Sequence, residues 1–127
     1  MTRARVKVYF DGGLRPVPDG VETAVVIRGV SHLRRNLGTG TSVDAEWLAL
    51  IDACRLIAAA GLSDVLLLGD CVTVVEQAGG RIRIDPRYAH HYATVRSLLP
   101  EGRVPPIRYI RRAQNLAGIA LARLHDR

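Results

Sequence analysis

The chain has 127 residues, and its length suits one compact domain, so we expect residues 1–127 to form a single domain. Apolar residues make up 48% and charged residues 24% of the chain, a composition that excludes general disorder. The net charge of +6 favours a polyanionic partner such as nucleic acid, because phosphates are bound by Arg and Lys.

Neither a membrane span nor a secretory leader is predicted. The longest apolar stretches, 56–60 and 65–68, are far shorter than the about 20 residues that a bilayer requires. Residues 1–7 lack the apolar segment of a secretion signal. The only cysteines, Cys54 and Cys71, indicate a reducing compartment without a disulfide framework. We therefore expect a cytoplasmic protein; its oligomeric state is left open by the sequence.

Three strands are predicted in the first third of the chain. Alternating hydrophobicity predicts a strand over 6–10 that ends at Asp11-Gly12-Gly13, followed by a segment rich in turn residues. A second strand is predicted over 23–28 and a third, more polar one over 31–37. Their short connections favour an antiparallel meander.

A helix follows, and then a buried strand. Thr41 or Ser42 can cap the helix in a capping-box variant with Asp44, and Gly61 is a favourable stop. The helix is predicted to bury one face, formed by Trp47, Ile51, Cys54 and Ala58. The continuous apolar run at 64–69 predicts a strand buried on both faces, and the strand–helix–strand order favours parallel pairing with the first strand.

The remaining elements complete an α/β pattern. They are a helix over 72–78, a helix from Asp85-Pro86 to about Leu99, a connector over 100–106, a strand over 107–110 and a helix over 115–124. The order predicts a mixed five-stranded sheet that is flanked by helices.

Three acidic residues occupy positions that this topology can bring together. Asp11 and Asp70 each follow a strand of the predicted parallel pair, and Glu46 lies in the first turns of the helix between them. Taken singly, each has a common structural explanation as a turn residue, a surface charge or a helix cap. Together, in this order, they predict a site for hard divalent cations, which prefer carboxylate oxygens.

Several sequence blocks together resemble the type 1 ribonuclease H family over nearly the whole chain. The blocks are 8–13, 45–50, 68–77, 107–112, Gln114-Asn115 and 120–122. The resemblance implies a ribonuclease H-like fold and a hydrolase, an endonuclease that uses Mg²⁺ or Mn²⁺. Its substrate would be the RNA strand of an RNA–DNA hybrid, cut to leave a 3′-hydroxyl and a 5′-phosphate.

The resemblance also implies roles for individual residues. Asp11, Glu46 and Asp70 correspond to catalytic metal ligands. Predicted substrate contacts are Gly12, Gly13, Ser42, Arg111, Arg112 and Asn115. For the arginines at 108, 111 and 112, the alternative is a solvated basic edge.

The chain departs from the family at the fourth acidic position, which aligns with Ile119, a side chain that cannot bind a metal. It also departs at two substrate-reading segments. The loop over 14–20 lacks Asn, and Thr41-Ser42-Val43 stands where the family has Thr-Asn-Asn, whose amides engage the minor groove and 2′-hydroxyls of the hybrid. The sequence therefore supports three hypotheses: the hybrid nuclease, a nuclease with another substrate, and a nuclease-weakened or inactive module that binds nucleic acid or protein.

Lesser candidates are interpreted as structural. His90 and His91 are adjacent on a predicted helix, so we expect them not to share a face and not to bind a metal. Cys71 is expected to be buried or to cap a helix, and Trp47 to lie in the core.

Overall fold

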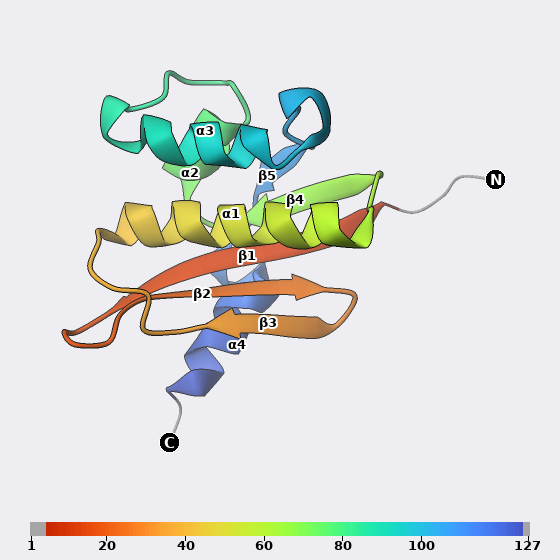
Figure 1. Cartoon of the computed structure of the whole chain (residues 1–127). Helices are drawn as coiled ribbons and strands as arrows, with labels where there is room; N and C mark the ends of the chain where they lie inside the picture. The colour runs from red at the N-terminus through yellow and green to blue at the C-terminus, as the bar shows by residue number, and fades with distance from the viewer. Residues whose placement is uncertain (1–4, 126–127) are drawn as a thin grey trace.

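The computed structural model describes residues 5–125, so residues 1–4 of the segment tested for a secretory leader, and residues 126–127, lie outside it. The sheet has five strands in the order β3-β2-β1-β4-β5 (Figure 1). The strands are β1 (Val6–Arg15), β2 (Gly20–Ile27), β3 (Val30–Arg34), β4 (Val65–Gly69) and β5 (Ile107–Tyr109). The first three pair antiparallel, whereas β4 pairs parallel with β1 and β5, which confirms the predicted mixed sheet.

Helices cover both faces of the sheet. Three of them, α1 (Ser42–Ala60), α2 (Val72–Ala78) and α3 (Ala89–Ser97), lie on one side, and α4 (Leu116–Leu124) crosses the other (Figure 1). Short 3₁₀ turns occupy Pro86–Tyr88, Pro100–Gly102 and Arg112–Gln114. Within residues 5–125, no helix is both long and apolar enough to span a membrane.

The core is divided unequally between the two faces. On the α1 side, Val8 and Phe10 of β1 pack with Trp47 and Leu50 in the larger hydrophobic cluster. On the α4 side a smaller cluster contains Ala24, Val26, Ala117 and Leu121. Burying a large apolar side chain contributes about 1.5–3 kcal/mol, so most of the apolar stabilisation comes from the α1 side.

The ends of α1 agree with the predicted signals. Thr41 accepts a hydrogen bond from the Asp44 backbone N–H, and the Asp44 side chain accepts one from the Thr41 backbone N–H, which completes the capping box. Gly61 ends the helix in the left-handed conformation, with φ of 63°. Ala58, predicted on the buried face, is instead exposed together with Ala59 and Ala60.

Four predicted elements differ from the structure in their bounds. The first strand does not end at Asp11, because Gly12 and Gly13 continue the antiparallel pairing with β2, opposite Thr23 and Glu22. The second strand therefore begins at Gly20, and the third covers Val30–Arg34 rather than 31–37. The predicted helix over 85–99 splits, because Asp85 caps a short 3₁₀ turn at Pro86–Tyr88 before α3 begins.

Candidate metal centre

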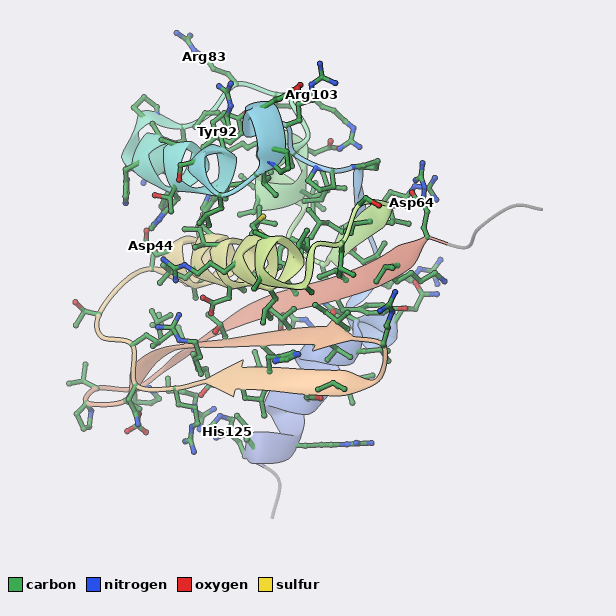
Figure 2. All side chains as sticks on the ribbon, turned by 45° about the vertical axis from the view of Figure 1, so that its right-hand side comes forward. Asp44, Asp64, Arg83, Tyr92, Arg103 and His125 are labelled. Carbon is green, nitrogen blue, oxygen red and sulfur yellow. The ribbon has the colours of Figure 1, made fainter. Side chains whose placement is uncertain are left out.

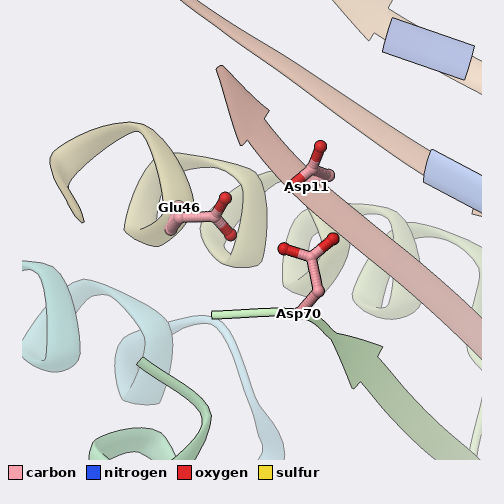
Figure 3. A group of neighbouring side chains, drawn as sticks. All are labelled: Asp11, Glu46 and Asp70. Carbon is pink, nitrogen blue, oxygen red and sulfur yellow. The ribbon is translucent and has the colours of Figure 1, made fainter. Parts of the chain in front are cut away.

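The three predicted acids converge at one edge of the sheet (Figure 3). Asp11 lies within β1, Asp70 directly follows β4, and Glu46 lies in the first turns of α1. Ligand oxygens from the three side chains lie within 4.8 Å of one another. The parallel pairing of Tyr9 with Leu68 accounts for this arrangement, because it places the residues two further along each strand side by side on the same face.

Gly12 allows α1 to approach β1 closely enough for Glu46 to join the two aspartates. A Cβ atom at Gly12 would lie 2.1 Å from the Ala45 carbonyl oxygen, which no side chain could tolerate. The Gly12 N–H also donates a hydrogen bond of 3.3 Å to Glu46 Oε1. Gly12 was predicted as a substrate contact. In the structure its lack of a side chain and its hydrogen bond to Glu46 hold α1 against β1 at the site.

Burial and mutual repulsion disfavour charge on Glu46 and Asp11. Burial, followed by the charges of Asp11 and Asp70, raises the pKa of Glu46 to about 10. Burial and the Asp70 charge raise the pKa of Asp11 to about 6, although the nearby Arg112 guanidinium acts in the opposite direction. Glu46 Oε2 is buried and has no hydrogen-bond partner among residues 5–125. A divalent cation would neutralise the repulsion between the carboxylates and give Glu46 Oε2 a partner, so these oxygens fit Mg²⁺ or Mn²⁺.

Asn115 links the start of α4 to the acids. Its Nδ2 donates hydrogen bonds of 3.0 Å to the Phe10 carbonyl and to Asp70 Oδ2, and its Oδ1 accepts one from the Ala117 N–H. The side chain is completely buried. Asn115 was predicted to contact the substrate, which would require an exposed side chain. In the structure its buried side chain orients Asp70 and caps α4.

Gly118 brings α4 directly against the acids. A Cβ atom at Gly118 would lie 3.2 Å from Asp11 Oδ2 and 3.7 Å from Asp70 Oδ2. Ile119, predicted to occupy the fourth acidic position, is the next residue of the helix and is 36% exposed. Sequence spacing from Asn115 singled out Ile119 alone; the closeness of Gly118 depends on how α4 lies on the sheet.

The other predicted substrate contacts surround this edge. Ser42 is exposed at the first residue of α1, and Arg111 and Arg112 are exposed before α4. Arg112 lies near enough to Asp11 to affect its pKa. Gly13 is half-buried, and a Cβ atom there would lie 3.3 Å from Glu22 Cγ.

Glu22 was not identified from the sequence, because the second strand was predicted to begin at residue 23, immediately after it. Its carboxylate is almost completely buried on the face that carries Asp11 and accepts a 2.8 Å hydrogen bond from His125 Nε2 at the end of α4 (Figure 2). Arg35 Nε lies 3.9 Å from the same carboxylate. The hydrogen bond from His125 fastens the end of α4 to β2.

The histidines differ from expectation in their geometry. The rings of His90 and His91 lie 4.0 Å apart, so adjacent positions do not separate them. His91, a residue of α3, also contacts α1: its Nε2 lies 2.9 Å from Asp44 Oδ1, and its ring stacks with Trp47. Cys71 begins α2 without a side-chain capping bond, and burial raises the pKa of its thiol.

Comparison with known proteins supports the same interpretation. The family described as reverse transcriptase-like matches residues 23–125. Ribonuclease H1 from the halophilic archaeon Halobacterium salinarum is similar with 31% identity and a TM-score of 0.72, over 94% of this chain and 99% of that chain. Among curated proteins, none matches the sequence.

Two further solved structures resemble the fold. LC11-RNase H1 in complex with an RNA/DNA hybrid has 26% identity and a TM-score of 0.71, over 96% of this chain and 100% of that chain. The N-terminal ribonuclease H domain of Rv2228c from Mycobacterium tuberculosis has 23% identity and a TM-score of 0.75, over 93% and 95%. With three acids gathered at the carboxyl edge of this sheet, the chain belongs to the reverse transcriptase-like family and is a ribonuclease H-like protein of the type 1 ribonuclease H group.

Proposed function

We propose that the protein is a metal-dependent endonuclease that hydrolyses the RNA strand of RNA–DNA hybrids. The observation that carries the proposal is the convergence of Asp11, Glu46 and Asp70 within 4.8 Å. The archaeal ribonuclease H1 with 31% identity and the hybrid complex of a similar structure support the choice of chemistry and substrate. We further infer that residues 1–127 act as one domain in the cytoplasm.

Each part of the site has a task in this reaction. Asp11, Glu46 and Asp70 would hold Mg²⁺ or Mn²⁺, which when bound polarises the phosphodiester and lowers the pKa of the attacking water. Asn115 fixes the orientation of Asp70 through its 3.0 Å hydrogen bond. Arg112, close to Asp11, places a positive charge where the phosphate approaches. No protein nucleophile is needed.

Cleavage of a labelled RNA–DNA hybrid tests the proposal. Under single-turnover conditions with Mn²⁺ or Mg²⁺, we expect RNA products with a 3′-hydroxyl and a 5′-phosphate. Asp70→Asn should lower the rate by at least about 100-fold, because losing even an outer-shell group of a metal site costs 10- to 100-fold. Glu101→Gln, which changes an exposed acid elsewhere in the chain, is the matched control. A protein that cuts no hybrid with either metal would refute the proposal.

Ile119 favours a second candidate, a nuclease-weakened module that binds nucleic acid. The substitution of an acid by Ile removes one metal ligand while the fold and the basic residues remain. This candidate predicts salt-sensitive binding of hybrids with little or no cleavage. Replacing Arg111 and Arg112 by Ala should then flatten the salt dependence of binding by about 0.7–0.9 for each phosphate contact that is lost. An unchanged slope would show that both side chains face away from the nucleic acid.

A further inference from the structure

A region with several cationic side chains lies on the sheet face that carries Asp11, beside the first residue of α4. It is a hollow of about 380 Å³ whose lining includes Arg5, Lys7, Arg28, Tyr9 and Leu116. We refer to it as the cationic pocket. The start of β1 and the turn between β2 and β3 lie at the same end of the sheet and form its walls (Figure 1).

Strand geometry connects the cationic pocket with the acids. One face of the β1 segment carries residues 5, 7, 9 and 11, because every second side chain along a strand points to the same side. Asp11 is therefore two positions from Tyr9 and four from Lys7, or about 7 Å and about 13 Å along the strand. Tyr9 also pairs with Val26, which places Arg28 of the following turn beside Lys7. These distances correspond to the length of a few nucleotides along one nucleic-acid strand, at about 3.4 Å for each nucleotide.

The charges of the cationic pocket are largely uncompensated. No Asp or Glu lines it within residues 5–125. Arg5 Nε lies 3.5 Å from Asp64 Oδ1 at the rim (Figure 2), whereas no carboxylate of the described chain lies within ion-pair distance of Lys7 or Arg28. Like charges gathered in a hollow attract a polyanion.

The floor of the cationic pocket is apolar and aromatic. Tyr9 is half-buried, and Leu116 is 43% exposed although it is a large apolar side chain. Cations along a groove, combined with an aromatic side chain, are the elements that bind single-stranded nucleic acid: the cations contact the backbone and the ring stacks on a base. A double helix is too stiff and wide to place a base in a hollow of this size.

We propose that the cationic pocket binds an unpaired strand that continues beyond the hybrid held at the acids. The inference rests on the proposed function for the position of the hybrid. It assigns Lys7 and Arg28 to backbone phosphates, and Tyr9 and Leu116 to a base. The protein would accordingly favour hybrids that carry a single-stranded extension on one side.

Binding measurements without divalent metal test this inference separately from cleavage. Fluorescence anisotropy in EDTA would compare a blunt hybrid with hybrids that carry an extension of about eight nucleotides at either end of the DNA strand. We expect one of the two extensions to tighten binding. Lys7→Gln and Arg28→Gln should each weaken that complex about 3- to 5-fold and lower its salt slope by about 0.7, without affecting the blunt hybrid.

Arg103→Gln is the matched control, since it removes the same charge from an exposed side chain between α3 and β5 (Figure 2) that does not line the cationic pocket. Equal losses for blunt and extended hybrids, or losses equal to those of the control, would overturn the assignment. If the extension-dependent loss occurs in a protein that cleaves no hybrid, the pocket is established and the nuclease proposal fails. If cleavage occurs but neither extension matters, the nuclease stands and the pocket proposal fails.

Discussion

The two faces of the sheet differ in what their side chains do. On the face covered by α1, β1 contributes Val8 and Phe10 to the larger hydrophobic cluster. On the opposite face the same strand presents Lys7, Tyr9 and Asp11, beside α4 and a smaller apolar cluster. Alternation along one strand thus supplies stability to one side and chemistry to the other. The comparison teaches that β1 keeps its charged side chains on the less heavily covered face, where water and ligands can reach them.

Two neighbouring glycines offer the sharpest way to break this division, because they lie on opposite faces of β1. Gly12→Ala should destabilise the protein by about 3 kcal/mol, since its Cβ would lie 2.1 Å from the Ala45 carbonyl oxygen. Gly13→Ala meets only the Glu22 side chain at 3.3 Å and should cost less than about 1 kcal/mol. Urea unfolding of both variants measures the difference. Equal costs would mean that α1 can move away from β1 freely.

Asn115 is the next largest expected effect, because it joins the two faces at the acids. Asn115→Ala removes three hydrogen bonds from a fully buried side chain, so we expect a loss of about 2–3 kcal/mol in the free energy of unfolding. Cleavage should fall about 10- to 100-fold, because Asp70 loses its orienting partner. Gln114→Ala, an exposed neighbour, is the control. A variant that folds stably and cleaves normally would contradict the role given to Asn115.

The acids should make the metal-free protein less stable as pH rises. Glu46 and Asp11 have folded-state pKa values of about 10 and about 6, above their ordinary values near 4. Between these limits the folded state binds more protons than the unfolded state, so stability is highest near pH 4 and falls toward pH 10.

Glu46→Gln removes most of this dependence and should stabilise the metal-free protein at pH 9 by about 1–3 kcal/mol. Thermal melting over this pH range, with and without Mg²⁺, measures it. Added metal should stabilise the wild type more than the variant, because the ion binds the folded acids preferentially. Glu101→Gln, which changes an exposed acid, should alter neither behaviour. A pH profile shared by wild type and Glu46→Gln would show that Glu46 is charged without metal.

The smallest expected effect concerns the missing fourth acid. Ile119→Asp should destabilise the metal-free protein by about 1 kcal/mol and raise the rate about tenfold, with the larger gain in Mg²⁺. Mg²⁺ demands a more complete octahedral shell than Mn²⁺, so it should benefit more from a restored ligand. Single-turnover cleavage and melting curves measure both effects.

Gly118→Asp distinguishes the two candidate positions on α4. Its Cβ would begin 3.2 Å from Asp11 Oδ2, which places a carboxylate against the acids. If Gly118→Asp increases the cleavage rate and Ile119→Asp does not, the fourth acidic position corresponds to residue 118 rather than residue 119. Activity gained by neither would favour the module that binds nucleic acid without cutting it.

Much of the fold was predictable from local signals. The capping box of Thr41 and Asp44, the stop at Gly61 and the apolar run before Asp70 are each encoded within a few residues, and each occurs as predicted. The end of the first strand was not predictable in this way, because the sequence Asp11-Gly12-Gly13 is typical of a turn. Only their pairing with Thr23 and Glu22 on β2 keeps them in the strand.

The candidate site divides in the same way. The order of Asp11, Glu46 and Asp70 along strand, helix and strand was sufficient to predict that they converge. Spacing could not predict that Asn115 would be buried against Phe10 and Asp70, since that contact joins residues 105 and 45 positions apart. Nor could it reveal Glu22 and His125, which meet across 103 positions.

By itself the sequence determined the element order, the mixed sheet and the three acids, because periodicity, capping and chain order are local properties of a polypeptide. Tertiary structure decided what surrounds the acids: the approach of α1 over Gly12, the contact of α4 through Gly118, and the gathering of Lys7, Arg28 and Tyr9 into one hollow. These features depend on strand register and on the path of a helix across a sheet. Both are fixed by the balance of contacts over the whole core, which no short segment of sequence contains.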